Sequence, residues 1–177
     1  MKKYFPIYLY GAIIIIEGIF LLFAKNNEFN FIKLSSGIIL TISAIVAFIA
    51  AFSQKRKQVQ FAYHEMHALA MLVYGISILL FCSTIESFIS FTAFLFIFYM
   101  FSEIILCSWL FNLGQKVVYT IIIIRVLLGL VVGIGTIVIM SLPSFKLEGF
   151  GILFILVGLN ILFYVPVMKV KELDEMP

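Results

Sequence analysis

Six apolar blocks follow one another along the 177-residue chain and constrain its fold more than any other feature. An α-helix rises 1.5 Å per residue, so about 20 apolar residues cross the roughly 30 Å of hydrocarbon in a bilayer. The blocks occupy residues 5–24, 31–52, 61–83, 88–111, 118–141 and 148–168, and the connections between them are too short for a soluble domain. The sequence therefore predicts an all-α membrane protein, with a single integral membrane domain over residues 1–177 and six transmembrane helices.

The composition excludes an ordinary soluble fold. Hydrophobic residues make up 64% of the chain and charged residues 12%, against about 45–50% and about 25% in soluble domains. The net charge is only +3, and the short run Lys55-Arg56-Lys57 is typical of a topology signal. We therefore expect the lipid bilayer as the partner of this chain, and no nucleic acid.

Basic residues are distributed unevenly between the two sides of the predicted membrane. One side carries Lys2, Lys3, Lys55, Arg56, Lys57, Lys116, Lys169 and Lys171, and the other carries Lys25, Lys33 and Lys146. Cytoplasmic loops are the ones enriched in lysine and arginine. We therefore expect both termini in the cytoplasm.

Glycines recur at a fixed step, which indicates an internal repeat. Gly18, Gly75 and Gly133 each precede an isoleucine and lie 57 and 58 residues apart. Gly37 and Gly151 also precede isoleucines, and their separation of 114 residues is twice that step. The chain is thus predicted to consist of three tandem helical hairpins, at approximately 5–52, 61–111 and 118–168.

The recurring glycines are expected to pack helices together, because small residues let helix backbones approach closely in lipid. The predicted packing positions are Gly18, Gly37, Gly75, Gly133, Gly151 and Gly158. Gly129 and Gly133 also form a GxxxG pattern. This pattern fits either packing within the bundle or a face through which copies of the chain form a homo-oligomer.

The third hairpin resembles a known family. The stretch Gly133-Ile134-Gly135, Leu142-Pro143, Gly151-Ile152-Leu153 and Gly158-Leu159 is similar to the pattern of the HdeD-like acid-resistance membrane proteins, small bacterial six-helix proteins made of two-helix repeats. The first two hairpins lack the proline that Pro143 supplies in the third. The resemblance implies a multi-pass protein of the bacterial cytoplasmic (inner) membrane with a role in tolerance of acid stress. It carries over no catalytic residues.

Ionisable residues within a membrane span are costly, so each is a candidate for function. His67, Glu103 and Arg125 lie six to eight residues from the cytoplasmic ends of their predicted spans, and so in one layer. The repeat step places Tyr10, His67 and Arg125 at equivalent positions of the odd-numbered helices. Val46, Glu103 and Asn160 are equivalent in the even-numbered helices.

We therefore predict a polar cluster in which Glu103 pairs with Arg125, and Tyr10, His67 and Asn160 complete a hydrogen-bonded group. Two interpretations of the cluster remain open. It can be a structural staple, in which loss of one charge would leave the other buried and unpaired. It can also be a proton- or ligand-responsive site, because histidine changes its charge between about pH 5 and 8.

Glu17 lies deeper in its span than this layer, without a basic residue at its depth. Its repeat equivalent is Tyr74, whose hydroxyl is the best partner that the sequence offers. A desolvated carboxyl without a cation is expected to hold its proton. The pair Glu17 and Tyr74 is therefore either a neutral contact between helices or a proton-binding site on a permeation path.

Other chemistry is not expected from this sequence. His64 and His67 are three residues apart, whereas the metalloprotease helix needs histidines four apart, so we expect no metal. No cofactor motif or catalytic residue stands out, and we expect no enzyme. The two functions that remain are a non-enzymatic, acid- or stress-protective membrane protein and a small proton or solute transporter or channel that uses the polar cluster.

Overall fold

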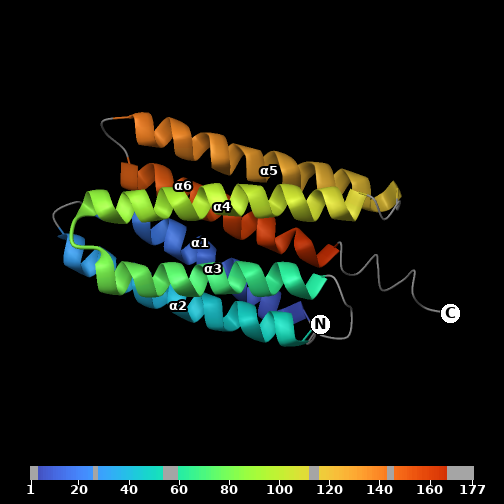
Figure 1. Ribbon diagram of the computed structural model, residues 1–177, viewed down its shortest axis with the longest axis horizontal. Helices are drawn as coiled ribbons and strands as arrows, with labels where there is room; N and C mark the ends of the chain where they lie inside the picture. Colours follow the sequence, from blue (N-terminus) through green and yellow to red (C-terminus); the bar gives the residue numbers. More distant parts are fainter. Residues whose placement is uncertain (1–3, 26–27, 54–59, 112–115, 143–145, 167–177) are drawn as a thin grey trace.

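The computed structural model of the protein describes residues 4–25, 28–53, 60–111, 116–142 and 146–166, and over these ranges it is all-helical. The six helices are α1 (Phe5–Phe23), α2 (Phe29–Ser53), α3 (Gln60–Phe81), α4 (Ile85–Phe111), α5 (Lys116–Ser141) and α6 (Lys146–Leu162). They run alternately up and down along one axis (Figure 1). The start of α1 and the end of α6 lie at the same end of the bundle (Figure 1).

Five stretches of helix are long and apolar enough to cross a membrane by length and composition: Phe5–Phe23, Phe29–Ala50, Ile85–Ser108, Tyr119–Ser141 and Lys146–Pro166. In α3 the apolar part that the structure describes, His67–Phe81, is shorter. The outer surface is also apolar, with side chains such as Ile16, Leu80 and Phe94 more than half exposed. The fold is thus that of a helical bundle with membrane-compatible helices, as the apolar blocks predict.

Local sequence accounts for where particular helices begin and end. Pro6 lies in the first turn of α1, where its missing N–H costs no hydrogen bond. α4 begins three residues before the predicted span because Thr84 and Ser87 cap it reciprocally, each side-chain oxygen accepting the other's backbone N–H at 3.2 Å. α6 ends at Leu162, and a turn at Phe163 separates it from a short helical stretch at residues 164–166. Pro166 accounts for this turn, because it has no backbone N–H to donate to the carbonyl of Leu162, four residues earlier.

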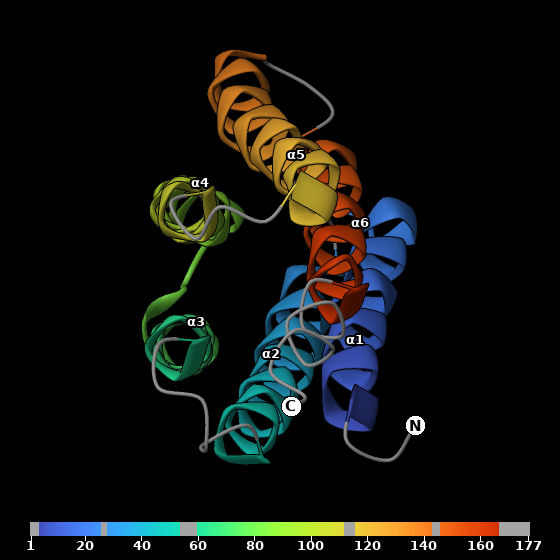
Figure 2. The same ribbon diagram turned by 90° about the vertical axis from the view of Figure 1, so that its right-hand side faces the viewer.

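Seen nearly end-on, the six helices form a ring in which α1 contacts both α2 and α6 (Figure 2). The most extensive contacts are α1 with α6 and α2 with α3, followed by α4 with α5. The two helices of each predicted hairpin contact each other less extensively than this. The strongest packing in the ring is therefore between helices of different predicted hairpins.

Glycines explain the closest of these contacts. A Cβ placed on Gly18 would lie 2.6 Å from the carbonyl oxygen of Gly151, and one on Gly151 would lie 2.7 Å from that of Gly18. Gly158 faces Gly11 in the same way, because a Cβ placed on Gly158 would lie 2.8 Å from the carbonyl oxygen of Gly11. These four glycines allow the backbones of α1 and α6 to touch, which no larger residue would permit.

The other two interfaces use glycines less symmetrically. Gly75 of α3 faces Gly37 and Thr41 of α2. On α5, Gly129 faces Glu103 and Gly133 faces Met100, both on α4. The GxxxG pattern of α5 is thus covered by α4 within the chain, because the glycines make room for two larger side chains, and it does not lie on the outer surface.

Candidate functional site

A buried polar cluster lies in the half of the bundle where α1 begins and α6 ends. We use the name polar cluster for Tyr10, His67, Tyr99, Glu103, Arg125 and Asn160, which come from α1, α3, α4, α5 and α6. All six side chains are buried. The structure therefore brings the five residues selected from the sequence into one region and adds Tyr99 to them.

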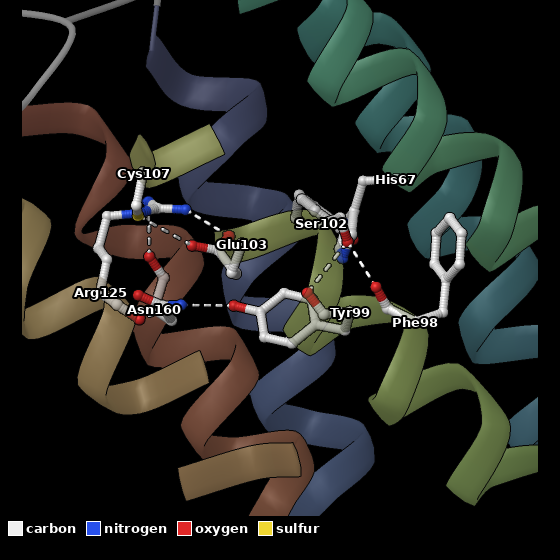
Figure 3. Close-up of polar contacts among 9 residues, drawn as sticks. His67, Phe98, Tyr99, Ser102, Glu103, Cys107, Arg125 and Asn160 are labelled. Atoms are coloured by element: carbon white, nitrogen blue, oxygen red, sulfur yellow. Dashed lines mark hydrogen bonds and ion pairs between the residues drawn. The ribbon is translucent and has the colours of Figure 1, made fainter. Parts of the chain in front are cut away.

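An ion pair forms one side of the cluster (Figure 3). Arg125 Nη2 donates to Glu103 Oε1 at 2.6 Å, and the two side chains are 1% and 0% exposed. Arg125 Nη1 donates to the backbone carbonyl of Asn160 at 3.0 Å. The guanidinium thus connects α5 to both α4 and α6, and its charge is balanced by a carboxylate in direct contact.

An aromatic ring lies beside the guanidinium and a thiol beside the carboxylate. The Arg125 Cζ lies 5.1 Å from the centre of the Tyr164 ring, a cation–π arrangement. The Cys107 thiol lies 3.9 Å from Glu103 Oε2, at the outer limit of a sulfur hydrogen bond. These contacts exclude water from the ion pair and leave it in a low-dielectric environment, where charge–charge attraction is strong.

Tyr99 connects the ion pair to the other side of the cluster. Its hydroxyl accepts a hydrogen bond from Asn160 Nδ2 at 2.6 Å. Its ring contacts the His67 ring edge to face, with centres 5.3 Å apart. His67 Nδ1 in turn shares a hydrogen bond of 2.5 Å with the Tyr10 hydroxyl. The cluster is therefore a continuous chain of contacts from α1 through α3 and α4 to α6 and α5.

Three members of this environment were missed by reasoning from the sequence: Tyr99, Cys107 and Tyr164. Residues four apart on a helix lie on the same face. Tyr99 and Cys107 are one turn before and one turn after Glu103, and Tyr164 is one turn after Asn160. All three therefore share a helix face with Glu103 or Asn160, and this spacing is the signal in the sequence that identifies them.

Glu17 is separate from the polar cluster. It is 0% exposed, and among the described residues neither of its carboxyl oxygens has a hydrogen-bond partner. Ser36 of α2 lies next to the carboxyl, but not in hydrogen-bonding geometry, and its own hydroxyl is also without a partner within the described ranges. A buried carboxyl in this setting depends on its proton to avoid an uncompensated charge.

The predicted pairing of Glu17 with Tyr74 is not what the structure contains. The Tyr74 hydroxyl instead hydrogen-bonds to Thr92 of α4. Thr92 donates its own proton to the Phe88 carbonyl at 2.7 Å, so its oxygen is available to accept the proton of Tyr74. The repeat step relates α1 to α3 but does not reveal which side chain of α4 faces Tyr74, so the predicted hydrogen bond between Glu17 and Tyr74 is wrong.

Metal binding finds no support in the described part of the chain. There, no three histidine, cysteine, aspartate or glutamate side chains are grouped closely enough to hold an ion. The side chain of His64, the first of the two histidines considered for metal binding, lies outside the described side chains. Pro143, which contributes to the family resemblance, lies outside the described residues. Comparison of the chain with protein-family models, with curated proteins and with solved structures gives no match.

Proposed function

We propose that this chain is a non-enzymatic, six-span protein of the bacterial inner membrane that protects the cell during acid stress, as the resemblance to the HdeD-like proteins implies. Its helices are proposed to form three tandem hairpins with both termini in the cytoplasm. The observation that carries the proposal is the ion pair of Arg125 and Glu103, which is sealed inside the bundle. In this position the polar cluster serves as a staple that holds α4, α5 and α6 together.

The sealed cluster favours a structural role over a transport path. A path needs continuous polar access from both sides of the membrane. Between the polar cluster and the far end of the bundle, the core contains Phe96, which packs on Phe154 with ring centres 4.6 Å apart and on Phe150 at 5.8 Å. These rings and Phe88 are less than 2% exposed. A layer of aromatic side chains in this place hinders the passage of an ion.

The geometry of the polar cluster also argues against a catalytic role. Its guanidinium and its carboxylate are in contact with each other and are nearly inaccessible to solvent. A catalytic acid or base must come within hydrogen-bonding distance of a substrate. Arg125 and Glu103 pair with each other in the interior of the bundle and do not meet this condition. Their burial supports the proposal that the protein is not an enzyme.

Survival after acid shock tests the proposed role. A strain without the chromosomal copy would be complemented with the wild-type chain, with Glu103→Gln, or with Glu148→Gln as a control at the start of α6, where the side chain is only partly buried. We expect rescue by the wild-type chain and by Glu148→Gln, and reduced rescue and reduced membrane abundance with Glu103→Gln. If the deletion has no phenotype in acid, the proposed function is wrong.

A proton or solute transporter is the second candidate, and Glu17 is the observation that favours it. A buried carboxyl without a partner among the described residues can bind and release a proton. Vesicles containing the purified protein and a pH-sensitive dye would measure proton flux under an imposed gradient. We expect flux no greater than in protein-free vesicles. Flux that is present in the wild type and absent in Glu17→Gln would replace our proposal with the transporter.

The proposed orientation has its own test. Single cysteines introduced at Lys3 and Lys171 are expected to react with a membrane-impermeant maleimide only after the cells are opened. A cysteine introduced at Lys25 is expected to react in intact cells, because the positive-inside rule places it on the opposite side. Labelling of the terminal cysteines in intact cells would reverse the proposed orientation.

A further inference from the structure

A second layer of buried polar side chains crosses the bundle at the end opposite to the polar cluster, where α1 ends and α2 begins (Figure 1). We use the name second polar layer for Glu17, Ser36, Tyr74 and Thr92, which come from α1, α2, α3 and α4. Each lies six or seven residues from the end of its helix on this side, and so at a shared depth of roughly 10 Å. Tyr74 is 5% exposed and the other three side chains are 0% exposed.

Neighbouring members of the second polar layer interact with one another. Ser36 lies next to the Glu17 carboxyl, and Tyr74 is near enough for the charge of Glu17 to act on it. The Tyr74 hydroxyl hydrogen-bonds to Thr92. The carboxyl of α1 is therefore surrounded by hydroxyl oxygens from α2 and α3, with Thr92 of α4 behind Tyr74.

The hydrogen bonds of this layer leave the Tyr74 oxygen with lone pairs only. Thr92 donates its proton to the Phe88 carbonyl at 2.7 Å, so Tyr74 donates its own proton to Thr92. Tyr74 then has no proton to donate to Glu17. Its oxygen and the oxygens of the carboxyl present the same kind of partial charge to each other, and a positive species between them would satisfy both.

Glu17 and Ser36 also have hydrogen-bonding capacity that the described residues do not use. Within the described ranges, neither carboxyl oxygen of Glu17 has a hydrogen-bond partner, and the Ser36 hydroxyl has none either. A buried carboxylate without a counter-charge is costly. Its stable forms are therefore the neutral acid and a complex with a cation.

The available donor atoms determine which cation fits. They are oxygens, which hard cations prefer, and the described residues form none of the histidine, cysteine and carboxylate groups that hold a transition metal. Glu17 supplies one negative charge, so a monovalent cation gives a neutral site, whereas a divalent one would leave a net charge buried.

The packing of α1 limits the size of the ion. A Cβ placed on Gly18, the residue after Glu17, would lie 2.6 Å from the carbonyl oxygen of Gly151. Because α1 touches α6 here, it cannot move away from α2 to enlarge the space between Glu17 and Ser36. Among the common monovalent cations this favours sodium over the larger potassium.

We infer that the second polar layer binds one sodium ion between the Glu17 carboxylate, the Ser36 hydroxyl and the Tyr74 oxygen. The ion takes the place of the proton on Glu17, so sodium and protons compete for one carboxyl. In sodium-free buffer the carboxyl keeps its proton and is neutral. The inference requires neither a path through the bundle nor the role in acid stress, and its test is independent of both.

Few other titratable groups bear on this competition. Among the described residues, Tyr74 is the titratable neighbour that interacts with Glu17. Lys33 of α2 lies one turn nearer the end of the bundle than Ser36, and its charge acts on Cys82 of α3. Glu148 of α6 is half-buried in the first turn of its helix. Sodium binding is therefore expected to strengthen as the pH rises, because one proton leaves for each ion bound.

Sodium titration of the full chain tests the site directly. The purified protein in detergent is brought from choline buffer into sodium at constant ionic strength and about pH 8. Binding of radioactive sodium and the Tm by circular dichroism are measured, with potassium as the comparison ion. We expect saturable binding of one sodium ion per chain. At ten times the dissociation constant, sodium should raise the Tm by about 3–6 °C, potassium should raise it much less, and sodium affinity should be lower at about pH 6.

Two serine variants of α2 separate the site from a general effect of buried hydroxyls. Ser36→Ala removes a proposed ligand, whereas Ser43→Ala removes an equally buried hydroxyl, also without a partner among the described residues, two turns further along the helix. We expect Ser36→Ala to lower sodium affinity about tenfold and Ser43→Ala to leave it unchanged. Glu17→Gln should abolish both sodium binding and the rise in Tm. If Glu17→Gln does not fold, the pair of serine variants decides alone.

Three results would overturn the inference. Equal effects of sodium, potassium and choline would mean that the carboxyl holds only a proton. Sodium binding that persists in folded Glu17→Gln would place the ion elsewhere. Equal losses of affinity in Ser36→Ala and Ser43→Ala would show that Ser36 is not a ligand. Circular dichroism and elution volume in detergent verify that each variant is folded before its sodium affinity is compared.

Discussion

Arg125 of α5 donates a 2.6 Å hydrogen bond to Glu103 of α4, and both side chains are almost completely buried. The same guanidinium reaches the Asn160 carbonyl of α6. Three helices therefore depend on one charged group in the interior of an apolar bundle. The stability of the fold should be most sensitive to mutation at this point.

Arg125→Leu is predicted to destabilise the protein by about 3–5 kcal/mol, because it leaves the Glu103 carboxylate buried without its partner. The free energy of unfolding can be measured by titration with SDS in mixed micelles, followed by circular dichroism. The double variant Arg125→Leu/Glu103→Leu removes both charges and should be more stable than Arg125→Leu alone. Equal stability of Arg125→Leu and the wild type would rule out the staple.

Glu17 and Glu103 provide a comparison between two buried carboxyls with different surroundings. Glu103→Gln removes the negative charge that balances Arg125, and we expect it to be strongly destabilising. Glu17→Gln replaces a carboxyl that has no hydrogen-bond partner within the described residues, and its effect should stay within about 1 kcal/mol. Equal losses in the same SDS titration would contradict this difference and point to a cation beside Glu17.

Glycine substitutions should separate backbone contacts from side-chain contacts. A methyl group on Gly18 would meet the backbone of Gly151 at 2.6 Å, whereas one on Gly135 would meet only the end of the Leu153 side chain, at 3.0 Å. Gly18→Ala is therefore predicted to cost about 1–3 kcal/mol. Gly135→Ala should be close to neutral, because Leu153 can adjust and alanine favours the helix. Thermal melting in detergent would measure both, and a reversed order would refute the contact between α1 and α6.

Tyr10→Phe removes the hydroxyl that hydrogen-bonds to His67. Hydrogen bonds between membrane helices contribute about 0.6 kcal/mol on average, so the predicted loss is of that order and far below the loss for Arg125→Leu. Tyr8→Phe, which removes an exposed hydroxyl two residues away on α1, is the matched control. A loss above about 2 kcal/mol for Tyr10→Phe alone would mean that the histidine side of the cluster, and not the ion pair, is the main staple.

The repeat in the sequence located much of the polar cluster. It placed Tyr10, His67 and Arg125 at one level of the odd-numbered helices and Glu103 and Asn160 at one level of the even-numbered helices. This works because depth along a helix depends only on the number of residues from its end. The contact between Glu103 and Arg125 then follows from depth and opposite charge.

The sequence by itself determined the number of helices, their approximate bounds and the depth of each polar residue. A helix in lipid satisfies its backbone hydrogen bonds internally, so a long apolar block is sufficient to predict it. The tertiary structure decided which helices are neighbours and which face each of them turns inward. In the tertiary structure α1 and α6 pack through Gly18 and Gly151, and Gly129 and Gly133 of α5 face α4. Tyr74 hydrogen-bonds to Thr92. These helices are apolar on nearly every side, so the hydrophobic pattern cannot orient them, and close packing of small and large side chains does so instead.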